Sequence, residues 1–168
     1  FYRGAAKIMA ADLKDTPTAG LGTQLCGDAH LSNFGGFASP ERVLLFDLND
    51  FDETLPGPFE YDVKRMAASF TIAARNNGFT DTEARAASLA SASAYREAML
   101  RFAEMGTMEI WYSRVSAQDV LDAVNAAASS LKGAKKKQAK AIHKAATKTA
   151  EKARTRDSTQ ALSKLAEH

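Results

Sequence analysis

Turn-forming residues divide this chain into two parts, and that division limits the possible fold more than any other feature. Between residues 14 and 58, the stretches KDTPTAGLG, SNFGGFASPER and PGP are rich in proline, glycine and small polar residues. They leave room only for short strands and loops. From about Glu60 to Leu131 the apolar spacing is helical. The pattern therefore predicts an α+β fold that is mainly helical, with one small β element.

Two short β-prone runs, residues 23–26 and 43–46, lie in the interrupted part. We expect them to pair as a small β-hairpin with polar loops at its ends. Capping signals and apolar spacing predict helices around this hairpin. The predicted helices span residues 4–13, 60–77, 80 to about 106, and 117 to about 131.

Charge separates the chain differently. Residues 1–131 carry 11 basic and 17 acidic side chains, whereas residues 132–168 carry 11 basic and 3 acidic ones. The second stretch is mostly alanine, lysine and polar residues, which favours a solvated helix without a core of its own. We therefore expect a folded body over residues 1–131 and a basic helical extension over residues 132–168.

Several protein classes do not fit this composition. With 168 residues, of which 45% are hydrophobic, the chain can bury one ordinary core. No signal peptide is evident, and no apolar run approaches the ~20 residues of a transmembrane helix. The single cysteine, Cys26, cannot form an internal disulfide. We expect a cytoplasmic protein with no membrane partner, and a start at Phe1 indicates a piece of a longer chain.

The stretch CGDAHLSNFG places Asp28, His30 and Asn33 close together, in a run too rich in glycine and small polar residues for a regular helix. Asp and Asn in such a loop can simply hydrogen-bond their own backbone. The alternative is a functional site, and that reading depends on the residues that follow.

A cluster of acids follows this loop. The run LLFDLNDFDETLPGPFEYD contains no lysine or arginine and six acidic residues, which are Asp47, Asp50, Asp52, Glu53, Glu60 and Asp62. Asp47 directly follows the apolar run VLLF, so we expect it to be partly buried at the end of a strand. A buried carboxylate needs a cation, a hydrogen bond or a raised pKa. A divalent ion such as Mg²⁺, which prefers hard oxygen ligands, is an economical partner.

Together, the two motifs resemble the catalytic core of the protein-kinase-like superfamily, especially the aminoglycoside and choline phosphotransferases. Their loop reads roughly H-G-D-x-H-x-x-N, and a metal-binding aspartate follows on the next hairpin strand. Here the corresponding residues are Gly27, Asp28, His30 and Asn33, followed by Asp47.

A closer similarity covers most of the chain. The segments FYRGAAKIMAADL, CGDAHLSNFG, FDLNDFDETLPGPFEYDVKRMAAS and ARTRDSTQALSKL are similar to the bacterial family called domain of unknown function 2252. The two resemblances imply that residues 1–131 are an incomplete kinase-like core. This core would resemble a kinase C-lobe, with helices packed around the hairpin, and would lack the lobe that covers the nucleotide.

The resemblance also implies roles for individual residues. Asp28 would be the catalytic base that orients an acceptor hydroxyl, and His30 could act as an acid or base or hold the loop in place. Asn33 and Asp47 would bind Mg²⁺ and, through it, ATP. Asp62 would support the loop through its backbone. The expected function is therefore an ATP- and Mg²⁺-dependent phosphotransferase that acts on a hydroxyl-bearing small molecule or protein.

Some features depart from that pattern. Cys26 stands where phosphotransferases often have histidine, and it is expected to be a small buried packing residue. The metal strand is unusually acidic, so Asp50 or Asp52 could share the metal. No G-x-G-x-x-G cover and no convincing strand lysine are present, so the segment alone is expected to be inactive.

Two other functions stay open. Clustered aspartates also serve metal-dependent phosphohydrolases. Residues 132–156 could present a basic helix to nucleic acid or another polyanion. No aromatic residue interleaves those lysines, so nucleic acid is not the expected partner.

Overall fold

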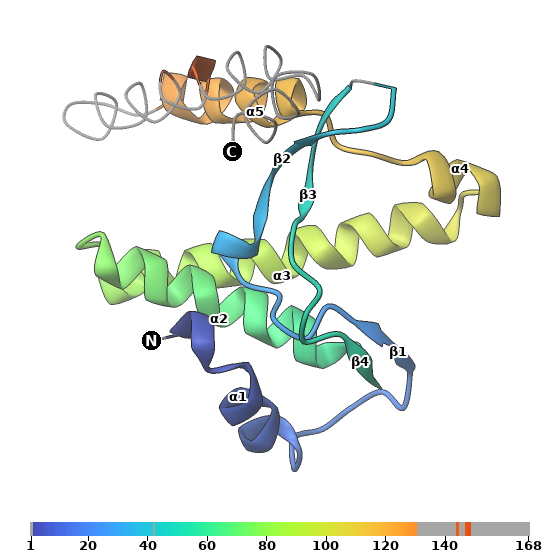
Figure 1. Cartoon of the computed structure of the whole chain (residues 1–168). Helices are drawn as coiled ribbons and strands as arrows, with labels where there is room; N and C mark the ends of the chain where they lie inside the picture. Colours follow the sequence, from blue (N-terminus) through green and yellow to red (C-terminus); the bar gives the residue numbers. More distant parts are fainter. Residues whose placement is uncertain (1, 42, 131–143, 145–146, 149–168) are drawn as a thin grey trace, which may run out of the picture. The chain divides into compact units, whose positions relative to one another are not determined.

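The computed structural model describes residues 2–41, 43–130, 144, 147 and 148 (Figure 1). The predicted class is confirmed, since the described residues form a mainly helical α+β fold with two small sheets. In chain order the elements are η1 (Tyr2–Gly4), α1 (Ala6–Leu13), β1 (Gly22–Leu25), η2 (Leu31–Asn33), β2 (Phe34–Ala38), β3 (Leu44–Leu48), β4 (Leu55–Pro58), α2 (Glu60–Asn76), α3 (Asp81–Ala103), α4 (Thr107–Tyr112) and α5 (Ala117–Ser130).

The chain divides into two compact units. The first unit contains residues 1–34 and 48–113, and the second contains residues 35–47 and 114–168. The boundary near residue 131, which the sequence predicts from charge, stays a prediction. Almost all of residues 132–168, including the predicted basic helix over residues 132–156, lies outside the described residues.

The strand pairing differs from the prediction. Both β-prone runs are strands, but they do not form one hairpin. β1 pairs with β4 in an antiparallel ribbon, with Gly22 opposite Pro58 and Leu25 opposite Leu55. Gly57 in this ribbon lies so close to Leu25 that a Cβ there would be 2.7 Å from a Leu25 methyl carbon. The run LPGP, whose composition is typical of a turn, is therefore a strand that pairs with β1.

β3 pairs instead with β2, in a second two-stranded sheet. The glycines of β2, in FGGFA, make that run look like a turn, so its strand was not predicted. Within the second unit, the Phe46 amide donates to the Val115 carbonyl at 2.9 Å, and Leu45 bridges to Ser116. These contacts join β3 to the start of α5.

The helices of the first unit agree closely with the sequence. α2 and α3 run antiparallel and side by side (Figure 1), joined by a turn at Gly78, whose φ is +75°. The predicted capping box is present, since Thr80 accepts from the Glu83 amide and the Glu83 carboxylate accepts from the Thr80 amide. The short helix α4 was not predicted separately.

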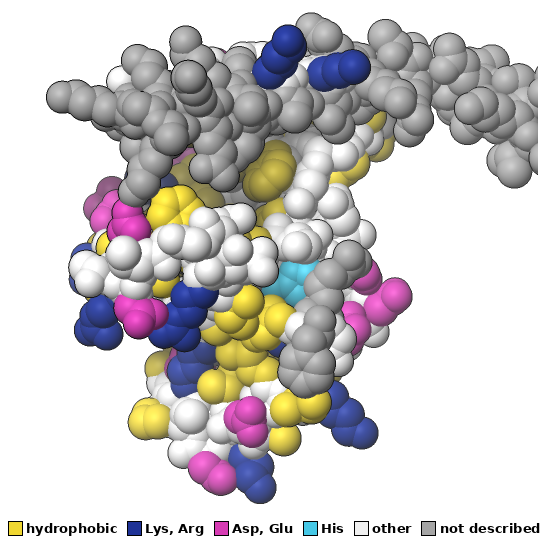
Figure 2. All heavy atoms as spheres, turned by 90° about the vertical axis from the view of Figure 1, so that its left-hand side faces the viewer, with side chains coloured by type: hydrophobic (Ala, Val, Ile, Leu, Met, Phe, Trp, Pro, Cys, Tyr) yellow, Lys and Arg dark blue, Asp and Glu magenta, His cyan; other side chains and the backbone are white. Residues whose placement is uncertain are grey.

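The best-buried positions of the first unit are unusually polar. The buried polar residues of the described chain are Asp28, His30, Asn33, Arg65 and Ser69, all in this unit. The buried apolar side chains around them are small or medium in size, such as Leu25, Cys26 and Ala29. Figure 2 shows hydrophobic side chains open to solvent between lysines and arginines on one face of the molecule. Polar contacts therefore make a large share of the interior of this unit.

Among the described residues, no helix is both long and apolar enough to cross a membrane.

Candidate functional site

The buried polar residues surround one loop, residues 26–33, which we call the polar loop. It begins where β1 ends and closes with η2. Gly27 has φ +85°, and a Cβ at this position would lie 1.9 Å from the Glu53 carbonyl oxygen. Only glycine fits this backbone conformation and this close approach. The loop therefore contacts residues 49–54, which follow β3 and which we call the acidic segment.

Asp62 binds the start of the polar loop. Its carboxylate accepts from the Cys26 amide at 2.7 Å and from the Gly27 amide at 3.1 Å, one bond to each oxygen. Hydrogen bonds to an ionised carboxylate are stronger than neutral ones. Asp62, from the first turn of α2, thus holds the backbone immediately before Asp28.

Asp28 lies in the loop with a cation beside it. Arg65 donates from Nε to Asp28 Oδ1, and its Nη2 pairs with the same oxygen. His30 Nε2 lies 3.3 Å from the other oxygen, Oδ2. Asp28, His30 and Arg65 are only 7%, 4% and 2% exposed. The cation that a buried carboxylate requires is, for Asp28, a guanidinium of the same chain.

Asn33 connects the polar loop to the acidic segment. Its Nδ2 donates to the Asp28 carbonyl and to the Asp50 carbonyl, both at 3.1 Å. The backbone carbonyl of Asn33 accepts from the backbone amide of Asn49 at 3.0 Å. Carbonyls only accept, so the amide nitrogen of Asn33 must face them. The Asn33 side chain therefore connects the backbone at Asp28 to the backbone at Asp50.

The acids between β3 and β4 lie at the surface. Asp50, Asp52 and Glu53 are exposed, and Asp50 Oδ1 accepts from the Asp52 amide at 3.1 Å, as in an Asx turn. Among the described residues, no three His, Cys, Asp or Glu side chains are grouped so that they could hold a metal.

Asp47 differs from its expected environment. We expected it to be partly buried at a strand end, but it is exposed and lies in β3, in the second unit. Side chains alternate along a strand, so Asp47 falls on the face opposite to the less exposed Phe46 and Leu48. Its approach to Asn33, in the first unit, stays a prediction.

Cys26 is buried, as predicted. It is 6% exposed, and its Sγ lies 3.7 Å from the Asp50 carbonyl oxygen. Burial raises the pKa of the Cys26 thiol, and nearby carboxylates add to that effect. A thiol of this kind is a poor nucleophile because its thiolate is disfavoured.

Sequence patterns alone did not predict roles for Arg65 and Ser69. Ser69 Oγ accepts from the Leu31 amide at 3.2 Å. Asp62, Arg65 and Ser69 are spaced by three and four residues, so they share one face of α2. They contact the polar loop in chain order, at residues 26–27, 28 and 31. Polar residues with helical spacing on one face of α2 are the signal that could have revealed them.

The N-terminal segment closes the other side of Arg65. The guanidinium carbon lies 4.5 Å from the centre of the Tyr2 ring, and Nη2 donates to the Tyr2 carbonyl at 2.9 Å. The Tyr2 hydroxyl in turn donates to the Arg65 carbonyl at 2.9 Å. Burial is the main cause that raises the pKa of the Tyr2 hydroxyl, which therefore stays a donor at neutral pH.

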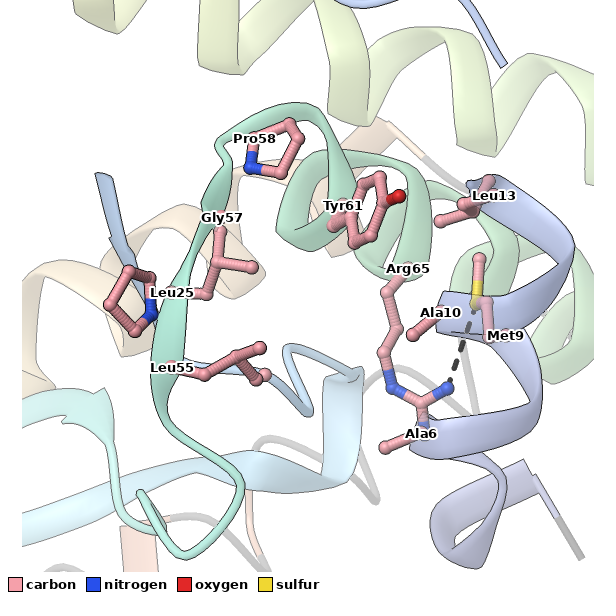
Figure 3. A pocket seen from close by; sticks show the side chains of 12 residues that line it. Ala6, Met9, Ala10, Leu13, Leu25, Leu55, Gly57, Pro58, Tyr61 and Arg65 are labelled. Atoms are coloured by element: carbon pink, nitrogen blue, oxygen red, sulfur yellow. Dashed lines mark hydrogen bonds between the residues drawn. The ribbon is translucent and has the colours of Figure 1, made fainter. Parts of the chain in front are cut away.

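A small pocket lies beside this arrangement (Figure 3). Its volume is about 110 Å³, and its walls come from α1, the β1–β4 ribbon and α2. The lining is mostly apolar, with Met9, Leu25 and Leu55 among its residues. Arg65 projects into the same space, where its Nη1 meets the Met9 sulfur at 3.6 Å. One face of the Arg65 side chain is thus reachable from the pocket.

Comparison with known families gives one match. The family described as uncharacterized protein conserved in bacteria (DUF2252) matches residues 1–168. The chain belongs to this family. The polar loop, the acidic segment and α2 are thus parts of a DUF2252 protein. No curated protein and no solved structure matches the chain.

Proposed function

We propose that this DUF2252 chain is the catalytic segment of a phosphotransferase that moves a phosphoryl group from Mg²⁺-bound ATP to a hydroxyl-bearing acceptor. The observation that carries the proposal is the double hydrogen bond of Asn33, which joins the backbone at Asp28 to the backbone at Asp50. Phosphoryl transfer depends mainly on positioning and on neutralising charge. An acceptor-binding loop tied to an acidic segment suits both needs.

The polar loop would bind and orient the acceptor. Asp28 is buried and forms an ion pair with Arg65. Asp62 fixes the backbone before it, so the Asp28 carboxylate has one orientation. In this proposal it accepts a hydrogen bond from the acceptor hydroxyl. His30, whose Nε2 lies 3.3 Å from Asp28 Oδ2, acts in this proposal as a support for the loop rather than as the acid or base.

The donor set suits magnesium. Mg²⁺ is usually held by one or two carboxylates together with substrate phosphates, rather than by a cage of protein ligands. Asn33 turns its amide nitrogen to two carbonyls, which leaves its Oδ1 as the atom for a metal. Asn33 and Asp47 would hold the ion, with the exposed Asp50 as a further ligand. When bound, the ion would neutralise charge on the phosphates of ATP.

The test is calorimetry of ATP binding to the full-length protein, with and without Mg²⁺. We expect Mg²⁺-dependent binding that Asp47→Asn weakens, since one negative charge leaves the coordination shell. Asp28→Asn should leave the dissociation constant nearly unchanged and lower turnover by about 10² to 10⁴-fold, as expected for a group that acts in the transition state. Glu53→Gln is the matched control among the exposed acids and should change neither quantity.

Opposite results are equally informative. The proposal is wrong if the wild type shows no Mg²⁺-dependent nucleotide binding, or if both variants behave like the wild type. Release of phosphate to water at the same rate with every hydroxyl acceptor added would instead indicate a metal-dependent phosphohydrolase.

A further inference from the structure

Arg65 is the most buried charged residue among those described, and its contacts with Asp28 are directed at one oxygen of that carboxylate. It is 2% exposed, and both Nε and Nη2 meet Oδ1. Among the described residues, the contact of the other oxygen, Oδ2, is the 3.3 Å approach of His30 Nε2. The two oxygens of one carboxylate are therefore not equivalent.

Arg65 itself is held from three directions. The Tyr2 ring stacks on the guanidinium, and the Tyr2 backbone carbonyl accepts from Nη2. The Tyr2 hydroxyl donates to the backbone carbonyl of Arg65. Met9 on α1 meets Nη1. Such an arrangement uses the planar fork of a guanidinium, which a lysine ammonium cannot reproduce.

We propose that Arg65 is a positioning residue that holds Oδ1 of Asp28 so that Oδ2 faces the acceptor hydroxyl. The inference rests on the proposed phosphotransferase activity. A carboxylate oxygen accepts two hydrogen bonds, so Oδ2 can keep the long contact with His30 and still bind the acceptor. The guanidinium fork fixes which oxygen is presented.

The pocket beside Arg65 makes a chemical rescue experiment possible. Truncation in Arg65→Ala removes the guanidinium and joins its space to the existing cavity of about 110 Å³. Figure 3 shows that the Arg65 side chain projects from α2 toward Ala6 across this pocket. A small guanidinium compound can therefore reach the vacated place next to Asp28.

The experiment measures ATP turnover by the full-length protein with Mg²⁺, and water takes the place of the acceptor hydroxyl. We expect Arg65→Ala to lower kcat by about 100-fold and to change the dissociation constant of Mg²⁺-ATP less than about threefold. Ethylguanidinium at millimolar concentration should restore kcat by about tenfold or more. Ethylammonium, with charge but no fork, and ethylurea, with the shape but no charge, should not.

Two further variants keep the test decisive if Arg65→Ala folds poorly. Arg65→Lys keeps the charge and should fold, as checked by circular dichroism, yet lose about tenfold in kcat with unchanged nucleotide binding. In the double variant Asp28→Asn/Arg65→Ala, ethylguanidinium should have no effect because its partner is gone.

The outcomes separate this inference from the proposed function. A wild type that shows no Mg²⁺-dependent ATP binding overturns both. An active wild type whose Arg65→Lys variant turns over normally, or whose Arg65→Ala variant gains equally from ethylurea and ethylguanidinium, overturns the role of Arg65 and leaves the phosphotransferase assignment standing.

Discussion

The polar loop and the acidic segment, residues 49–54, are neighbours in space, yet their acids lie in opposite environments. Asp28 is buried against Arg65, whereas Asp50, Asp52 and Glu53 are exposed. The difference comes from α2, which directs Asp62, Arg65 and Ser69 at the polar loop. An acid is buried here only where another element supplies a donor or a cation, in agreement with the cost of burying an unpaired charge.

The contact between the two regions depends on Gly27. Gly27→Ala should destabilise the protein by about 3 to 4 kcal/mol, since positive φ and a clash with backbone act together. Urea denaturation measures the loss. Gly78→Ala is the control, because its φ is also positive but a Cβ there meets nothing within 4 Å, and about 1 kcal/mol is expected. Equal losses would show that the loop does not approach Glu53.

Removing one charge should matter in one region only. Asp62→Asn replaces an acceptor oxygen by a donor that faces the amide of Cys26 or Gly27, so we expect a loss of about 2 to 3 kcal/mol. Asp52→Asn, in the exposed segment, should stay within about 0.5 kcal/mol of the wild type. A large loss in the second variant would mean that the acidic segment is held as firmly as the polar loop.

Cys26 reports on the burial of the polar loop. At pH 8 we expect alkylation by iodoacetamide to be about tenfold or more slower in the folded protein than in urea, because burial raises the pKa of this thiol and blocks access. Since the folded pKa is the higher one, the associated stability is complete below the unfolded pKa of about 8.5 and is lost as pH rises through the folded pKa. Cys26→Ser should lack that alkaline loss, and fast alkylation of the folded wild type would contradict a buried thiol.

Asp119 in the second unit separates hydrogen bonding from burial. It is exposed, yet it accepts from the Ser116 amide at 2.9 Å and the Ser116 hydroxyl at 2.7 Å, and these bonds lower the pKa of its carboxyl. Because the folded pKa is the lower one, its contribution is present above the unfolded pKa and is lost as pH falls through the folded value. Asp119→Asn should slightly weaken amide-exchange protection in the first turn of α5 at pH 6. Equal protection of variant and wild type at pH 6 would mean that exposed acids contribute nothing even when hydrogen-bonded.

The helices of this chain follow from local sequence. The turn at Gly78, the capping box of Thr80 and Glu83, and the pairing of Ser116 with Asp119 are contacts within a few residues, so sequence spacing predicts them. The strand pairing does not follow in the same way. In the ribbon of β1 and β4, the paired residues Leu25 and Leu55 are 30 positions apart in the chain, and Gly22 and Pro58 are 36 apart. Nothing local selects β4 over β3 as the partner of β1.

Local sequence predicts the helical framework, the two β-prone runs and the polar loop that contains Asp28 and Asn33. The pairing of the strands, the burial of particular acids and the position of Arg65 beside Asp28 follow from tertiary contacts. The cause is the range of the contacts. Helix caps and turns depend on neighbours in the chain. The environment of a carboxylate depends instead on donors and charges that folding brings to it from 35 to 37 positions away, as the contacts of Asp62 and Arg65 show.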